Sequence, residues 1–290
     1  MSKAEIVLAA LAAAAIVALI RALALAAAKK LLETGSLPAA PAYGGRAALS
    51  IRKWLRELNP RIPGFLRARL RPDDFPGLPL TLLALGAIYV AALLAGLIHE
   101  VIEAEEVLAF DERVNSALAP LRKDPLIGAF LWITALGAGP ALAAVASTAT
   151  AFLWAGGRRS APIFPLWTAF LGAQLTTWAG KYAIDRHRPE FIEGVSAMSP
   201  SFPSGHSTGA MAVYGFLAYA LARDLPGWRP RFEVVFWAGT LIALIGFSRI
   251  YLSVHYLTDV VGGFLVGGFW LLVAFAIAEW RRGVHGRPRP

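Results

Sequence analysis

The sequence predicts an all-α integral membrane protein, a helical bundle with a six-span core and one additional N-terminal span. Three observations support this fold class. Hydrophobic residues make up 57% of the 290 residues and charged residues only 16%, and the mean hydropathy is +0.56. The high hydrophobic content, the low charged content and the positive mean hydropathy all depart from those of an ordinary soluble domain. Several apolar stretches are also long enough to cross a bilayer as helices.

Seven apolar stretches are candidate spans. They cover residues 6–28, 78–98, 126–155, 161–180, 207–222, 234–247 and 256–278. The third is too long for one helix perpendicular to the membrane, and it contains Gly137-Ala138-Gly139-Pro140, which bends or breaks helices. We expect a single kinked and tilted span there, with a re-entrant segment followed by a span as the alternative.

The first stretch is either a retained anchor or a cleavable signal peptide. Small residues run through Ala22 to Ala28, as they do near cleavage sites, but only Lys3 precedes the stretch and Lys29-Lys30 follows it. This arrangement of charge favours a retained anchor. We therefore divide the chain into residues 1–75, an N-terminal anchor with a basic connector, and residues 76–290, a six-span domain.

The connector is rich in Pro and Arg. Within it, residues 51–58 and 65–70 mix apolar and basic side chains, as segments that lie on anionic headgroups do. A solvated linker is the alternative. The net charge of +9 is explained by membrane orientation and lipid headgroups, so we expect membrane lipids as partners and no nucleic acid.

Charge in the loops predicts the orientation. If the connector is cytoplasmic, 19 Lys and Arg residues lie on that side and 8 on the other. The positive-inside rule then places the loop 181–203 outside. We expect a multi-pass protein of the bacterial inner (plasma) membrane whose functional face is turned to the periplasm or exterior.

Three polar runs meet on this one face, whichever orientation holds. They are Lys181 to Pro189 (KYAIDRHRP), Pro203 to His206 (PSGH), and Ser248 to Asp259 (SRIYLSVHYLTD). Each run lies at a predicted span end, and the alternation of spans brings these ends to the same side. The cations Lys181, Arg186, Arg188 and Arg249 collect here against the charge bias of that face, which predicts an anion-binding site.

Each run alone has a simpler explanation. Lys181 and Arg188 lie two turns apart on one side if the helix continues toward Pro189, but a Lys and an Arg at a span end are commonly membrane anchors. Pro203 to His206 offers backbone N–H groups and a glycine at a helix start, which suits a phosphate or a plain helix cap. Their joint position on one face favours catalysis.

His255 and Asp259 lie four residues apart near a predicted helix start. The carboxylate can accept a hydrogen bond from one ring nitrogen and leave the other free and more basic. The charged residues around these runs are expected to be solvated, with substrate contact as the alternative for the loop residues. They are Asp185, His187, Glu190, Glu193 and the acidic stretch 100–112.

The three runs together resemble the signature of the type 2 phosphatidic acid phosphatase superfamily, which also includes the vanadium haloperoxidases. The pattern KxxxxxxRP, PSGH and SRxxxxxHxxxD is complete over roughly residues 76–280, and residues 1–75 lie outside it. The matching positions are Lys181, Arg188, Pro189, Pro203, Ser204, Gly205, His206, Ser248, Arg249, His255 and Asp259.

This resemblance implies a metal-independent phosphohydrolase with a phosphohistidine intermediate and no cofactor. His255 is then the nucleophile, Asp259 its orienting partner and His206 the acid that protonates the leaving oxygen. The phosphate-binding residues are Lys181, Arg188, Ser204, Gly205 and Arg249. The sequence has no cysteine, so a thiolate metal site and a cysteine nucleophile are excluded.

The expected substrate is a lipid phosphate or an isoprenoid diphosphate, of the undecaprenyl diphosphate or phosphatidate type. A headgroup can enter a site at the end of a bundle while its tail stays in hydrocarbon, and the short turns favour an isoprenoid diphosphate. A lipid phosphotransferase that passes the phosphate to another lipid is the alternative. A soluble haloperoxidase is disfavoured by the spans, and the sequence does not determine the oligomeric state.

Overall fold

The computed structural model describes residues 3–33, 69, 75, 77–156, 162–192 and 198–285. The chain separates into two compact units, Met1–Leu82 and Leu83–Pro290. In the first unit α1 (Lys3–Glu33) is a single long helix over the predicted N-terminal span. The two connector segments predicted to lie on headgroups fall almost wholly outside the described residues.

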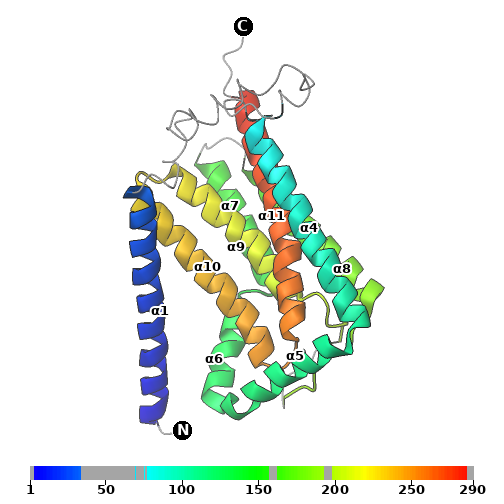
Figure 1. Cartoon of the computed structure of the whole chain (residues 1–290). Coiled ribbons are helices and arrows are strands. Elements are labelled where there is room, and N and C mark those ends of the chain that lie inside the picture. Colours follow the sequence, from blue (N-terminus) through cyan, green and yellow to red (C-terminus); the bar gives the residue numbers. More distant parts are fainter. Residues whose placement is uncertain are drawn as a thin grey trace. The chain divides into compact units, whose positions relative to one another are not determined.

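The remaining described elements are all helical, which confirms the predicted fold class. Figure 1 shows how they are arranged, with α5 running across the ends of α10 and α11. The elements are α4 (Leu78–Glu103), α5 (Glu105–Leu118), the 3₁₀ turn η1 (Ala119–Leu121), α6 (Asp124–Ala135), α7 (Gly139–Ala155), α8 (Ile163–Ile184), α9 (Gly205–Asp224), α10 (Trp228–Tyr251) and α11 (Leu257–His285).

Three described helices are long and apolar enough to cross a membrane on their own. They are α4, α10 and residues 257–282 of α11, and the pair α6 and α7 counts as a fourth if it forms one span. Helices α8, with 22 residues, and α9, with 20 residues, are long enough but do not reach this apolarity. The count of seven spans therefore stays a prediction.

A bend interrupts residues 126–155, and it is compatible both with one kinked span and with a re-entrant segment followed by a span. Helices α6 and α7 meet at an angle of 47°, and Gly137 lies in the break between them. A Cβ atom at Gly137 would lie 2.5 Å from Cγ2 of Ile245 and 3.3 Å from Cβ of His206. Glycine is required because the break packs directly against α9 and α10 beside the predicted site.

Helix α9 lies at the centre of the bundle and packs on α7, α8, α10 and α11. Its tightest approach is to α11, where glycines replace side chains. A Cβ atom at Gly263 would lie 2.6 Å from the backbone oxygen of Ser204, and one at Gly267 would lie 2.5 Å from that of Thr208. These glycines set the distance between the two helices whose first turns carry Ser204 and Asp259.

We expect Gly263→Ala to separate α9 from α11 and to reduce both stability and activity. Overpacking against backbone typically costs about 1–3 kcal/mol. Gly268→Ala is the matched control, because its Cβ would meet only the end of Met211 at 3.8 Å. Thermal unfolding in detergent and activity assays on both variants test this. Equal behaviour of the two variants would contradict the packing argument.

Candidate active site

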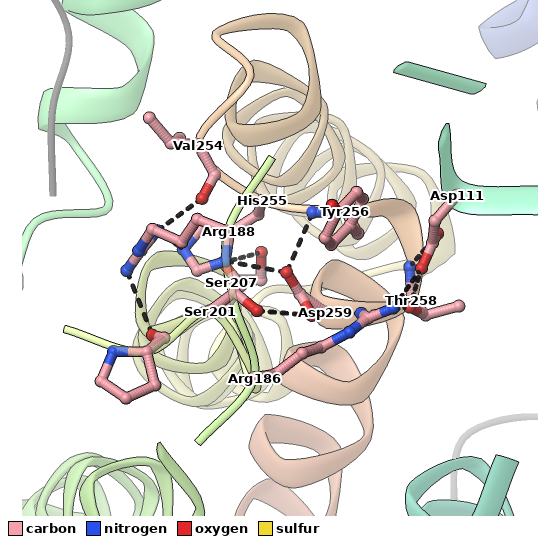
Figure 2. A network of polar contacts seen from close by, with 12 residues as sticks. Asp111, Arg186, Arg188, Ser201, Ser207, Val254, His255, Tyr256, Thr258 and Asp259 are labelled. Carbon is pink, nitrogen blue, oxygen red and sulfur yellow. Dashed lines mark hydrogen bonds and ion pairs between the residues drawn. The ribbon is translucent and has the colours of Figure 1, made fainter. Parts of the chain in front are cut away.

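The three polar runs come together at one end of the bundle, as predicted. Lys181 lies in the last turn of α8, the loop 185–204 leads into α9, and the loop 252–256 joins α10 to α11. The amide of Ser204 donates to the backbone oxygen of Asp259 at 3.0 Å, which fastens the start of α9 to the first turn of α11. Figure 2 shows part of this region, with Arg188, His255 and Asp259 among the labelled residues.

His255 and Asp259 form the predicted pair. His255 lies just before α11 rather than within it, and its Nδ1 is 3.3 Å from Oδ2 of Asp259. The same carboxylate oxygen accepts the amide of Tyr256 at 2.9 Å. Both side chains are buried, so this short loop holds the ring in one orientation.

The second ring nitrogen of His255 faces the cations. Nε2 lies 3.3 Å from a guanidinium nitrogen of Arg188. A guanidinium can only donate and an ionised carboxylate can only accept, so these partners assign the proton to Nδ1 and the lone pair to Nε2. The imidazole is therefore arranged to attack through Nε2.

Burial lowers the pKa of His255 to about 3, although the bond to Asp259 acts in the opposite direction. Arg249 and Arg188 add to the lowering through their positive charge. The neutral imidazole, the only form with a free lone pair, is thus favoured over the whole physiological range before an anion binds.

Lys181 and Arg188 do meet, but not on one side of a helix, because the helix does not continue to Pro189. Helix α8 ends at Ile184, and Asp185 has the left-handed φ of 50° that ends helices. The chain instead folds back so that both cations donate to the carbonyl oxygen of Pro200. Lys181 donates to Pro200, and Arg188 donates to Ser199 at 2.6 Å and to Pro200 at 3.2 Å.

Arg188 already uses all of its donors, because it also contacts Ser199 Oγ and the backbone oxygen of Val254. A bound anion would have to replace one of these contacts, and the contact to His255 must open for attack. Arg249 has unused capacity. One terminal nitrogen donates to Thr134 at 2.7 Å, while its buried Nε has no partner among the described residues.

The first turn of α9 carries the remaining predicted residues. Ser204 is buried, and its hydroxyl accepts a bond from Ser207 at 3.0 Å without capping the helix. Its amide is used by Asp259, and the first backbone bond into α9 comes from Thr208, so the N–H groups of Gly205, His206 and Ser207 have no acceptor within the helix. A Cβ atom at Gly205 would meet Thr177 only at 3.5 Å, so packing within the protein does not require this glycine.

His206 faces the same cluster from α9. It lies within electrostatic range of Arg249, His255, Lys181 and Arg188. Its ring makes no hydrogen bond to the rest of the described chain. Because it is half-buried beside the break at Gly137, the imidazole is available to a substrate.

Arg186 is not a free anion-binding cation, which corrects the sequence-based expectation. Its guanidinium nitrogens lie 2.7 Å from Oδ1 of Asp259 and 2.8 Å from Oδ2 of Asp111. Its Cζ atom lies over the Tyr256 ring, 4.6 Å from the ring centroid. Burial by itself would lower the pKa of Arg186, but the two carboxylates raise it. Lys181, Arg188 and Arg249 keep the excess positive charge.

Asp111 contacts this group of residues and was missed by sequence reasoning, and the prediction that residues 100–112 form a solvated face is wrong for it. Its side chain is fully buried. A signal was present, since Val107, Asp111, Val114 and Leu118 follow helical spacing and place a carboxylate on an otherwise apolar stripe. The loop residues Asp185, His187 and Glu190 are exposed, as expected, and Glu193 lies outside the described residues.

A metal cage is not evident in the part of the chain that the structure describes. No three His, Cys, Asp or Glu side chains come together there in a way that could hold an ion. The positive charge at the site comes from side chains, and metal independence stays a prediction.

Comparison with known proteins agrees with this architecture. A family model described as the PAP2 superfamily matches residues 161–283. The crystal structure of a transmembrane PAP2 type phosphatidylglycerolphosphate phosphatase from Bacillus subtilis superposes with a TM-score of 0.60 and 31% identity, covering 68% of this chain and 96% of that one. The similarity therefore includes nearly the whole of that structure.

Two curated relatives match over shorter regions. Phosphatidylglycerophosphatase B of Bacillus subtilis (strain 168) is 45% identical over 95 residues, which are 32% of this chain and 45% of the relative. Lipid A 1-phosphatase of Rhizobium etli is 33% identical over 138 residues, 41% of this chain and 55% of the relative. The chain spans about half the length of the curated relatives it matches.

Proposed function

Because the chain belongs to the PAP2 superfamily, we propose that it is a membrane phosphohydrolase that removes phosphate from a lipid phosphate or isoprenoid diphosphate through a phosphohistidine. The observation that carries the proposal is the Nε2 lone pair of His255. It faces Arg188, which lies with Lys181 and Arg249 in a group of cations that form no direct ion pair with a carboxylate in the described part of the chain.

In the first chemical step, the Nε2 lone pair of His255 attacks phosphorus and the bond from phosphorus to the leaving oxygen breaks. His206 gives its proton to that oxygen, since a bound phosphate dianion favours the protonated imidazole. Lys181, Arg188 and Arg249 stabilise the equatorial oxygens, where charge accumulates. Asp259 stabilises the positive charge that develops on His255.

In the second step, water attacks phosphorus and the bond between nitrogen and phosphorus breaks. His206, now neutral, takes the proton from this water, and His255 leaves with its Nδ1 proton still bound to Asp259. Inorganic phosphate is released and both histidines return to their starting forms, so the cycle needs no further reactant.

The substrate class is proposed from position and chemistry. The cations lie at an end of the bundle, where a phosphorylated headgroup can reach them while its tail remains in the bilayer. Relatives named for phosphatidylglycerophosphate and lipid A support phosphorylated lipids as a class. An isoprenoid diphosphate remains our first choice within that class.

A panel of phosphate-release assays tests the activity. Detergent-solubilised protein is incubated separately with undecaprenyl diphosphate, phosphatidate, phosphatidylglycerophosphate and a lipid A phosphate, beside a His255→Ala control. We expect release of inorganic phosphate from at least one of these lipids by the wild type alone. Label from a ³²P donor that passes to a second lipid instead would show the phosphotransferase alternative to be right.

Metal removal and a phosphate mimic test the source of positive charge. Because Lys181, Arg188 and Arg249 supply the charge that Mg²⁺ supplies elsewhere, we expect full activity in excess EDTA. We also expect inhibition by vanadate, which mimics a five-coordinate phosphorus. Activity that disappears in EDTA and returns with Mg²⁺ would contradict the mechanism.

The orientation is proposed from the charge of the loops. Met198 lies in the loop 185–204 and is fully exposed, and the native chain has no cysteine that could interfere. We expect Met198→Cys to react with an impermeant maleimide in intact cells with a permeable outer barrier. Labelling only after lysis would place the site on the cytoplasmic side.

A further inference from the structure

Asp111 is a buried charge outside the signature residues. It is the one buried residue of α5, and a carboxylate taken out of water is costly unless it is paired and hydrogen-bonded. Its partners belong to the loop 185–204 and to α11, which follow it by 75 and 147 positions. The interaction therefore joins three segments that are distant in sequence.

The first partner of Asp111 is the start of α11. Its Oδ1 accepts the amide of Thr258 at 3.1 Å, and its Oδ2 accepts the Thr258 hydroxyl. Thr258 is the second residue of the helix, whose amide has no acceptor within the helix. Asp111 thus caps α11 from another helix, as Figure 2 shows, and fixes the turn on which Asp259 lies.

The second partner is Arg186, which links Asp111 to Asp259. One guanidinium nitrogen donates to Asp111 at 2.8 Å, and the other donates to Oδ1 of Asp259 at 2.7 Å and to the Thr258 hydroxyl at 2.8 Å. Oδ2 of Asp259 is left for His255 and the amide of Tyr256. The carboxylate cannot rotate without breaking contacts on both oxygens.

The charges of this group matter as much as the geometry. Arg186 shares one positive charge between two carboxylates, so the group of three carries a net negative charge. That charge faces His255, which becomes positive when it attacks phosphorus. Without Asp111, Arg186 would neutralise Asp259 and weaken its support of the imidazolium.

We propose that Asp111 is a positioning residue, which acts through Arg186 and Thr258 to hold Asp259 in place and charged toward His255. This inference rests on the proposed function, because it concerns the rate of phosphohistidine formation. It assigns a role in the reaction to α5, a helix that contributes nothing to the three signature runs.

Asp111→Asn tests the proposal. The side-chain oxygen of asparagine can still accept a hydrogen bond from Thr258, but the negative charge that competes with Asp259 for Arg186 is lost. Purified full-length protein is mixed with a ³²P-labelled substrate on which the wild type is active, and phosphohistidine is quenched over time. We expect the rate constant to fall about 100-fold, as for a misplaced reacting group, with KM within about twofold of the wild type. Glu106→Gln, an exposed carboxylate on the same helix, should match the wild type.

The amplitude of labelling separates positioning from folding, since it counts the active sites that fold. A reduced rate at full amplitude supports the proposal, whereas a reduced amplitude at the wild-type rate would mean that Asp111 only stabilises the fold. An unchanged rate and amplitude would also overturn it. Labelling of the wild type but not of His255→Ala establishes the underlying function independently of either outcome.

Arg186→Lys is the second variant, and it tests the same link to Asp259 if Asp111→Asn does not fold. A lysine keeps the charge but cannot donate to Asp111 and Asp259 through two fixed nitrogens. We expect a similarly slow rate at full amplitude. The double variant should be no slower than the slower single variant, because both changes break one link. If the rate reduction in the double variant equalled the product of the two single reductions, Asp111 would not act through Arg186.

Discussion

His255→Ala is expected to abolish turnover and covalent labelling together. The substitution removes the Nε2 lone pair that lies beside Arg188, while Asp259 keeps Arg186 and the amide of Tyr256 as partners. Removing a nucleophile of this kind typically costs at least about 10⁴-fold in kcat. The remaining charge at the site should still bind a phosphorylated substrate.

Rapid-quench labelling with a ³²P substrate measures this result directly. The wild-type label should be stable to base and labile to acid, as a phosphoramidate is, and the variant should carry none. His187→Ala is a matched control, because that histidine is exposed in the same loop region and should leave labelling unchanged. A label that persists on the His255→Ala protein would place the nucleophile elsewhere.

The convergence of the signature residues could be predicted because it depends on few properties of the chain. Alternation of spans places Lys181, Ser204 and His255 at one end of the bundle whatever the details of packing. The spacing of His255 and Asp259 then predicts their contact through helical geometry. In the structure Asp259, in the first turn of α11, contacts both His255 and the amide of Ser204.

The contacts within the site could not be predicted because they depend on how a loop folds. Nothing in the local pattern shows that α8 ends at Ile184 rather than at Pro189, since the left-handed Asp185 can be judged only with its surroundings. Arg186 and Arg188 have the same chemistry and lie two positions apart. Arg186 is paired with carboxylates and Arg188 faces the imidazole of His255, and only the tertiary structure separates these positions.

Asp111 shows a limit of a different kind. A carboxylate on an apolar stripe is visible in the sequence, but its partner is 75 residues away and could have been any cation on that face. The sequence pattern identifies a buried charge, whereas the residue that balances it follows from long-range packing of α5 on α10 and α11.

His206→Ala is expected to act on the second half of the reaction, which distinguishes this histidine from His255. His206 has Ala210 four residues later and so has no carboxylate partner of the kind that His255 has. With an activated aryl phosphate, whose leaving oxygen needs little protonation, the variant should still form phosphohistidine at close to the wild-type rate. Hydrolysis of that intermediate needs a base for water and should slow by about 10²- to 10⁴-fold.

The two phases can be separated on one substrate. The variant should show a full burst of aryl alcohol followed by very slow turnover, with phosphohistidine accumulating to near one per active site. A lipid phosphate, whose alkoxide is a poor leaving group, should instead be slow in the first phase as well, because His206 must supply the proton. A variant that loses the burst with the aryl phosphate but hydrolyses a preformed phosphohistidine normally would reverse the assignment, since His206 would then act in the attack and not in the release.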